Sequence, residues 1–203
     1  MWTNLPNLLT LSRIAVIPIL VATFYFEGPW ASYAACLLFT AAALTDWLDG
    51  HVARRQNQQS ELGRCLDPIA DKLLVAAALF MLVAFQRVDG ATVLAAVVIL
   101  CREILVSGLR EYLAGLRVGV PVSKLAKWKT GIQMTAIGFL LVGEAGPAYL
   151  PVVAIGTVGL WCAAALTLVT GYDYLHAGLR HLQPGAVPPE KPHDQPATPG
   201  RAR

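Results

Sequence analysis

Six long apolar stretches, separated by short polar connections, constrain the fold of this chain more than any other feature. They cover residues 8–26, 32–50, 66–86, 91–113, 131–149 and 151–176. Each stretch is long enough, or nearly so, to cross a hydrocarbon core of about 30 Å as a helix. Only 14% of the 203 residues are charged, whereas soluble domains carry about 25%. The sequence therefore predicts an all-α polytopic membrane protein with six transmembrane helices.

Positive charge is distributed unevenly over the connections between these stretches. One set of connections has Arg87 alone, and the other has Arg54, Arg55, Arg64, Arg117, Lys124, Lys127 and Lys129. Because lysine and arginine accumulate on the cytoplasmic side of a membrane, we expect the second set of connections and both termini to be cytoplasmic. We expect the protein itself to lie in the inner membrane of the cell. The net charge of +3 is too small to indicate a nucleic-acid partner.

The two ends of the chain differ in character. Residues 2–13 are amphipathic and predict an N-terminal interfacial helix that runs into the first span. Asn7 and Thr10 repeat on its polar side, where they would bind the headgroup of a lipid substrate or simply face the interface. Residues 182–203 are rich in proline, glycine and charge, which favours a disordered cytoplasmic tail after one domain of residues 1–181.

Four aspartates lie within 26 residues of this apolar chain. Asp46 and Asp49 are three residues apart, and Asp67 and Asp71 are four apart, so each pair shares one face if its segment is helical. Two such faces turned together would hold like charges that repel each other, and a cation must then lie between them. Mg²⁺ or Mn²⁺ suits a group of carboxylates that also receives phosphate oxygens. The pattern indicates metal-assisted transfer at phosphorus; solvated acids at the membrane edge are the alternative.

The four aspartates belong to a longer pattern, D-x2-D-G-x2-A-R-x8-G-x3-D-x3-D, which begins at Asp46 and ends at Asp71. This pattern resembles the signature of the CDP-alcohol phosphotransferase family of integral membrane enzymes. The resemblance implies a six-helix membrane fold, usually a homodimer, with two divalent ions in a cytoplasmic cavity that binds a CDP-linked lipid.

Roles for individual residues come from this resemblance, because spacing alone does not select the base among the four acids. Asp46, Asp49 and Asp67 match metal ligands. Asp71 matches the catalytic general base, which also lies at the metal site. The positions that match the CDP-lipid pocket are Gly50, Ala53, Arg54 and Gly63. Helix packing through small residues is another reading of Gly50 and Ala53.

Segments outside the signature narrow the expected reaction. NLPNLLTLSR, REILVSGLREYLA and VSKLAKWKT resemble the members of the family that transfer a phosphatidyl group from CDP-diacylglycerol to sn-glycerol 3-phosphate and release CMP. Arg110, Lys127 and Lys129 are the candidates for binding the acceptor phosphate. Attraction to anionic membrane lipids is the alternative for the lysines. Four polar residues of the fourth stretch fall on one helical face, which we expect to face the bundle interior or a wet cavity: Glu103, Ser107, Arg110 and Glu111. A structural network of Arg102 with Glu103 is the alternative.

Three other functions fit parts of the pattern. The acceptor could instead be inositol phosphate, phosphatidylglycerol or serine. An aspartate-rich membrane prenyltransferase would also bind Mg²⁺ and a diphosphate, but the positions Gly50, Ala53, Arg54 and Gly63 argue against it. A cation transporter that uses the acids as a membrane site leaves Gly50, Ala53 and Arg54 unexplained.

Overall fold

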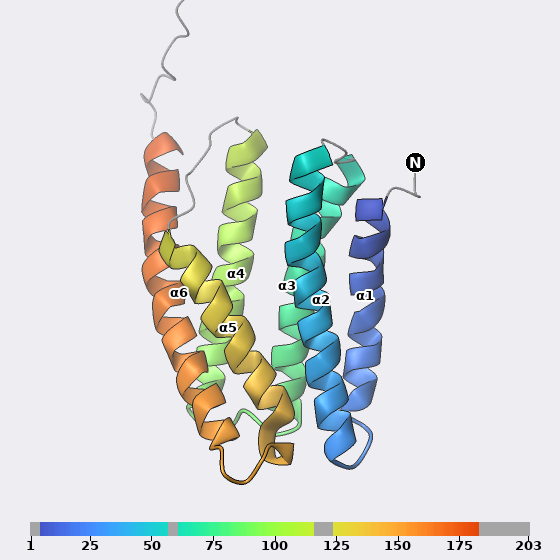
Figure 1. Ribbon diagram of the computed structural model, residues 1–203. Coiled ribbons are helices and arrows are strands. Elements are labelled where there is room, and N and C mark those ends of the chain that lie inside the picture. The colour runs from blue at the N-terminus through green and yellow to red at the C-terminus, as the bar shows by residue number, and fades with distance from the viewer. Residues whose placement is uncertain (1–4, 57–60, 116–123, 183–203) are drawn as a thin grey trace, which may run out of the picture.

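The computed structural model describes residues 5–56, 61–115 and 124–182, and within these ranges all regular structure is helical. This result confirms the prediction of an all-α chain. The helices are α1 (Leu5–Thr23), α2 (Pro29–Gln56), α3 (Glu61–Ala84), α4 (Thr92–Gly115), α5 (Lys124–Val142), the short 3₁₀ helix η1 (Gly143–Ala145) and α6 (Val152–Leu182). Successive α-helices run in opposite directions along one bundle (Figure 1).

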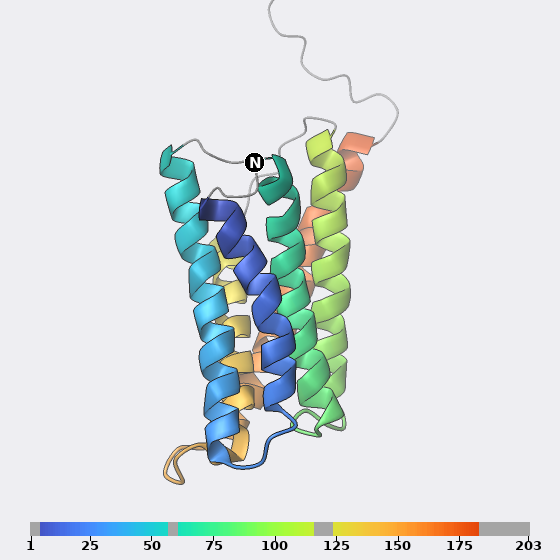
Figure 2. The same ribbon diagram turned by 90° about the vertical axis from the view of Figure 1, so that its right-hand side faces the viewer.

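The bundle consists of two halves of three helices. In one half, α1 packs against both α2 and α3, and Figure 2 shows it crossing in front of them. In the other half, α6 packs against α4 and α5. The most extensive packing between the halves is that of α2 on α5. At the top of Figure 1, α2 ends and α3 begins; we call this the motif end of the bundle.

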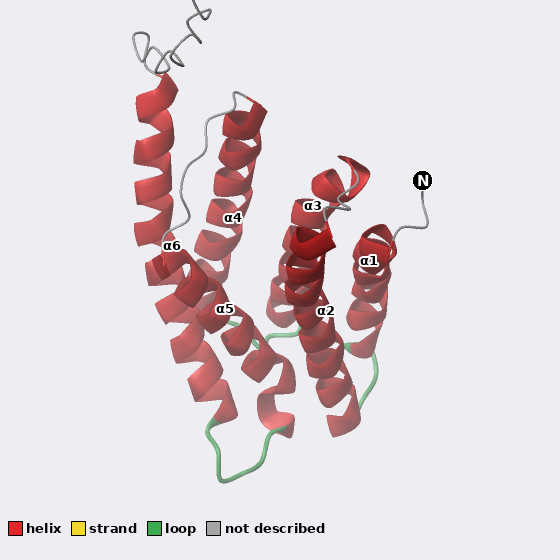
Figure 3. Cartoon of the chain, turned by 45° about the horizontal axis from the view of Figure 1, so that its top comes forward, coloured by secondary structure: helices red, strands yellow, loops and turns green. Residues whose placement is uncertain are grey.

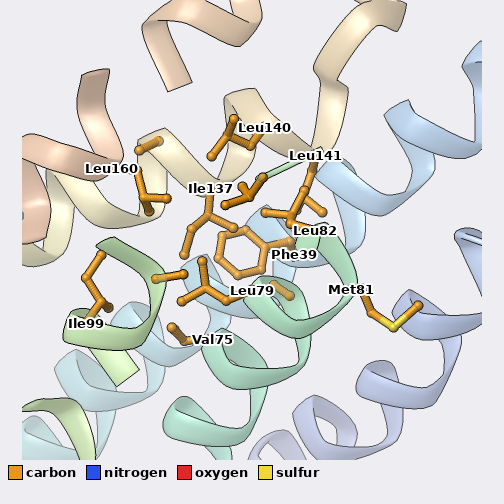
Figure 4. Packing of buried hydrophobic residues seen from close by; sticks show 14 of the residues in the cluster. Phe39, Val75, Leu79, Met81, Leu82, Ile99, Ile137, Leu140, Leu141 and Leu160 are labelled. Atoms are coloured by element: carbon orange, nitrogen blue, oxygen red, sulfur yellow. The ribbon is translucent and has the colours of Figure 1, made fainter. Parts of the chain in front are cut away.

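A buried apolar core joins the two halves. Phe39 of α2 lies at its centre, with Leu79 and Leu82 of α3 on one side and Ile137 and Leu141 of α5 on the other (Figure 4). All five side chains are almost completely buried. Because each buried side chain of this size stabilises the fold by roughly 2 kcal/mol, the core fixes the packing of α2 on α5 below the motif end.

The outward faces of the helices are apolar as well. Phe80 is 72% exposed and Leu37 is 70% exposed. Among the described residues, two helices are long and apolar enough to cross a membrane, Thr92–Gly115 and Val152–His176. A soluble protein rarely exposes so much apolar surface, so these faces are consistent with a membrane protein. Six spans and an interfacial first helix remain predictions. Residues 5–23 form one uninterrupted helix, so the expected interfacial segment and the start of the first span belong to the same helix.

The fifth helix corrects one predicted boundary. The expected span of residues 131–149 begins within α5 but is wrong at its C-terminal end, because α5 covers Lys124–Val142. Gly143 has a φ of +55°, a conformation that glycine adopts without steric cost, and it is the first residue of η1. Pro147 and Pro151 then prevent the helix from continuing. The predicted span therefore extended through a turn that the backbone makes at Gly143.

Arg87 holds the opposite end of the bundle together. Its Nη1 donates to the Leu141 carbonyl, its Nη2 donates to Ser32 Oγ at 2.9 Å, and its guanidinium lies 5.2 Å from the centre of the Phe24 ring. Burial lowers the pKa of this guanidinium from its ordinary value, while the charge of Glu144 opposes the shift. Arginine stays protonated nonetheless, and its contacts connect α2, α5 and Phe24, the residue that follows α1.

We expect Arg87→Ala to lower the free energy of unfolding by about 2 kcal/mol, because two acceptors lose a charged donor and Phe24 loses its cation. Thermal unfolding in detergent measures the change. Glu27→Ala, an exposed substitution in the connection between α1 and α2, is the control. An unchanged melting temperature for Arg87→Ala would show that the contacts do not stabilise the bundle.

Candidate active site

The motif end brings the two halves of the aspartate pattern close in the backbone. Asp46 and Asp49 lie in the last turns of α2, Asp67 and Asp71 lie in the early turns of α3, and the two helices pack against each other. Both segments lie at the top of Figure 1. The side chains of residues 46–65 are outside the described part of the structure, so the roles assigned to Asp46, Asp49, Gly50, Ala53, Arg54 and Gly63 stay predictions.

Asp67 receives a hydrogen bond from the first helix. Thr10 is buried on α1, and its hydroxyl donates to Asp67 Oδ1. Arg13 lies one turn further along α1 and is also buried. The predicted headgroup residue Thr10 therefore orients an acid of the motif, a contact typical of the groups that surround a metal ligand. Asn7, the other predicted residue of this face, has no described side chain.

Asp71 lies at the edge of a polar cavity of about 660 Å³. Helices α3, α4, α5 and α6 contribute its walls. The charged side chains that line it are Asp71, Lys72, Arg102, Glu103, Arg110, Lys127 and Lys129. Because five of these groups are cations and two are carboxylates, the cavity suits an anion with more than one negative charge.

The three residues proposed from the sequence for the acceptor phosphate all line this polar cavity. Lys129 is only 3% exposed and contacts Glu103. Lys127 lies on the same helix and is exposed. The Arg110 guanidinium lies 5.6 Å from the centre of the Tyr174 ring, so a cation–π contact with α6 holds it. The fold thus gathers Arg110, Lys127 and Lys129 around the same space as Asp71.

Two residues that line the polar cavity were not predicted as site residues from the sequence. Lys72 directly follows Asp71, and its ammonium lies 2.7 Å from Asp71 Oδ2; a lysine inside an apolar span was the available signal. Arg102 was considered only as a structural partner of Glu103. Its Nη1 does lie 3.5 Å from Glu103 Oε1, and its Nη2 donates to Thr170 Oγ1 at 3.1 Å, but it also lines the cavity.

A second, mostly apolar groove of about 710 Å³ runs between α3 and α4. Ser107 and Glu111 line this groove, although the sequence placed them on one face with Arg110. Glu103 lines both spaces. A helix turns by about 100° per residue, so Arg110 falls on the cavity side of Glu103 while Ser107 and Glu111 fall on the groove side.

The structure also allows a test of whether divalent metals fit the motif end. Asp67 and Asp71 lie one turn apart on α3 and are both partly accessible. Their hard oxygen donors are the type that Mg²⁺ and Mn²⁺ prefer. Among the described residues no three acidic, histidine or cysteine side chains come together, and two of the four proposed ligands belong to the part of α2 without described side chains.

Known proteins resemble the chain along most of its length. The chain is 48% identical over 174 residues to the CDP-diacylglycerol–glycerol-3-phosphate 3-phosphatidyltransferase of Rickettsia bellii, covering 86% of this chain and 94% of the relative. It is 42% identical over 179 residues to the cardiolipin synthase (CMP-forming) of Oryza sativa subsp. japonica, covering 81% of this chain and 54% of that relative.

A solved structure shows the same fold. The phosphatidylinositol phosphate synthase of Mycobacterium tuberculosis, in complex with manganese and citrate, matches with a TM-score of 0.63 over 97% of this chain and 89% of that one, at 21% identity. The same enzyme with CDP-DAG bound matches with a TM-score of 0.62 over 92% and 91%. In addition, the family model for CDP-alcohol phosphatidyltransferase matches residues 3–169. The chain belongs to the CDP-alcohol phosphatidyltransferase family.

Proposed function

We propose that the chain transfers the phosphatidyl group of CDP-diacylglycerol to sn-glycerol 3-phosphate, which yields phosphatidylglycerophosphate and CMP. The observation that carries this proposal is the polar cavity, where Asp71 lies among cations from three helices. Such a cavity suits an acceptor that has both a hydroxyl to deprotonate and a phosphate to bind. Relatives with this activity in their names, at 48% and 37% identity, support the same conclusion.

The aspartates of the motif would hold two divalent ions, Mg²⁺ or Mn²⁺. The proposed ligands are Asp46, Asp49, Asp67 and Asp71. Bound ions would neutralise the charge of the diphosphate that links CMP to the lipid. The complex of the related Mycobacterium tuberculosis enzyme with manganese supports this choice of metal. In this chain, the hydrogen bond from Thr10 would keep the Asp67 carboxylate in one orientation.

The chain supplies the general base and the acceptor site from neighbouring helices. Asp71 would take the proton of the glycerol hydroxyl as its oxygen forms a bond to the lipid-bearing phosphorus. The bond from that phosphorus to the oxygen of CMP breaks, and CMP leaves with the electron pair. Arg110, Lys127 and Lys129 would hold the acceptor phosphate, and the planar guanidinium of Arg110 can donate two parallel hydrogen bonds to it.

The CDP-lipid would bind on the α2 side of Asp71. Its proposed pocket is formed by Gly50, Ala53, Arg54, Gly63, Asn7 and Thr10. The small residues of this set would let the ligand approach the helix backbone. This arrangement places the lipid phosphorus between the motif acids and the polar cavity, which is the position that attack by the acceptor requires.

The same account gives the arrangement in the membrane. We expect six spans in the inner membrane, with the motif end, both termini and residues 182–203 on the cytoplasmic side. The beginning of α1 and the end of α6 lie at the motif end in Figure 1, which supports a common side for both termini. Residues 1–181 would form the single membrane domain, and we expect a homodimer.

A second candidate differs only in the acceptor. The resemblance to a cardiolipin synthase makes phosphatidylglycerol a specific alternative. Phosphatidylglycerol carries one negative charge on a phosphodiester, whereas glycerol 3-phosphate carries up to two on a monoester. Five cations and two carboxylates around the cavity favour the monoester.

An acceptor screen tests the proposed function. Purified protein with CDP-diacylglycerol and Mg²⁺ or Mn²⁺ is given glycerol 3-phosphate, inositol phosphate, serine or phosphatidylglycerol in turn. We expect release of labelled CMP with glycerol 3-phosphate. Turnover confined to any other acceptor would contradict the proposal.

Asp71→Asn should reduce kcat by at least about a hundredfold, because the amide cannot accept the proton of the hydroxyl. CDP-lipid binding, measured separately, should persist. Asp173→Asn, an exposed substitution on α6, serves as the control. Near-normal CMP release from Asp71→Asn would refute its assignment as the base.

Thr10→Val should raise the Mn²⁺ concentration for half-maximal binding by about tenfold, since loss of a hydrogen bond to a metal ligand weakens affinity by this order. Thr23→Val is a matched control on the same helix, because the buried Thr23 hydroxyl bonds only within α1, to the Leu20 carbonyl. Electron paramagnetic resonance of free Mn²⁺ gives both affinities. Equal Mn²⁺ affinity in the two variants would show that Thr10 does not support the metal site.

A further inference from the structure

Glu103 is a buried carboxylate in the apolar middle of α4, where it is only 8% exposed. Three cations contact it. Lys72 Nζ of α3 lies 3.2 Å from Oε2, Arg102 Nη1 lies 3.5 Å from Oε1, and Lys129 Nζ of α5 also contacts Oε1. A carboxylate persists at this depth only when such partners compensate its charge.

The carboxylate uses only part of the donor capacity of the two lysines. An ammonium group has three N–H donors. Among the described residues, Lys72 contacts Asp71 and Glu103, and Lys129 contacts Glu103. Both lysines line the polar cavity. Glu103 therefore keeps the ammonium groups in place while N–H donors remain to bind an anion there.

Arg102 extends this cluster to α6. Its Nη2 donates to Thr170 Oγ1 at 3.1 Å. Its side chain also packs closely against Gly171, the residue that follows Thr170 in α6. A Cβ at Gly171 would come within 3.0 Å of Arg102 Cγ, so the glycine provides the space that the arginine occupies. The ion pairs of Glu103 connect α3, α4 and α5, and the hydrogen bond from Arg102 to Thr170 extends the cluster to α6.

The pair of Lys72 and Glu103 also closes one wall of the cavity. Both residues line the polar cavity and the apolar groove between α3 and α4. Ile69, Leu73 and Ile104 line that groove and are exposed. The ion pair therefore separates the charged space from a surface suited to lipid.

We propose that Glu103 is a positioning residue for the acceptor: it fixes the ammonium groups of Lys72 and Lys129 at the wall of the polar cavity so that they bind a phosphate monoester. This inference rests on the proposed function. Without the carboxylate, Lys72, Arg102 and Lys129 would repel one another and separate. The loss should therefore appear in the binding of the acceptor and not in that of the CDP-lipid, whose proposed site lies toward α2.

Glu103→Gln tests the proposal, because it keeps the shape of the side chain and removes its charge. We expect KM for glycerol 3-phosphate to rise by about tenfold, the loss expected when charge-assisted contacts are misplaced. KM for CDP-diacylglycerol should stay within about twofold. Inorganic phosphate probes the anion site alone, and its inhibition constant should rise together with the KM for glycerol 3-phosphate. Glu103→Asp, which restores the charge, should recover part of the phosphate affinity.

Glu111→Gln is the matched control, since Glu111 lies two turns further along α4, is exposed, and lines the apolar groove but not the polar cavity. It should change neither KM. Thermal unfolding of every variant shows whether the bundle is intact. If Glu103→Gln does not fold, Glu103→Asp carries the test, with an expected rise of a few fold in KM for glycerol 3-phosphate.

Three results would overturn the inference: equal rises in both KM values, a fall in kcat with unchanged KM for glycerol 3-phosphate, or unchanged phosphate inhibition. Each would assign Glu103 to stability or to the chemical step instead. A wild-type protein that releases no CMP with glycerol 3-phosphate would refute the proposed function, which keeps the two failures distinct.

Discussion

The cost of holding charges inside an apolar bundle governs the arrangement of this protein. A carboxylate or an ammonium at that depth loses several kcal/mol of hydration, and only a close partner of opposite charge compensates the loss. Glu103 provides that compensation for cations on α3, α4 and α5. Because these helices come from both halves of the bundle, charge pairing fixes how the halves meet around the polar cavity, and the cavity is where we expect the reaction to occur.

Apolar packing and charge pairing act at different levels of the bundle. The core around Phe39 holds α2 against α5 and α3 (Figure 4). In Figure 3, which brings the motif end forward, the ends of α4 and α6 stand apart from those of α2 and α3. Arg87 connects helices at the opposite end. The helices are thus held together away from the motif end, while polar side chains line the end where we propose that substrates bind.

Much of this arrangement could be predicted from the sequence. Apolar runs of sufficient length located every helix, and the spacing of Asp67 and Asp71 placed both on one face of α3. The sequence also named Arg110, Lys127 and Lys129 as candidates for one site, and all three line the polar cavity. The end of α5 was predicted too late, although Gly143, Gly146 and Pro147 are residues that commonly end a helix. The exact residue at which the helix ends depends on the backbone, which turns at Gly143 with a positive φ.

The side of α4 that each polar residue faces depended on packing. A wide arc of α4 carries four polar residues, Glu103, Ser107, Arg110 and Glu111. The position of α3 against α4 decides which of them face the polar cavity and which face the apolar groove. Glu103 falls at the division, with the polar cavity on one side and the apolar groove on the other. Lys72 was overlooked for a related reason: its partner on α4 is distant in sequence, so only the fold reveals that it belongs to the cavity.

The central claim is that the metals of the aspartate motif and the phosphate of the acceptor bind side by side, on either face of Asp71. Phosphorus relaxation of glycerol 3-phosphate in the presence of protein-bound Mn²⁺ tests it directly, because the effect of the metal falls steeply with distance. We predict strong relaxation enhancement that Lys129→Met abolishes while Mn²⁺ stays bound. Phosphorus relaxation no faster than that of glycerol 3-phosphate free in solution would show that the acceptor phosphate does not bind near the metal, and it would contradict the account.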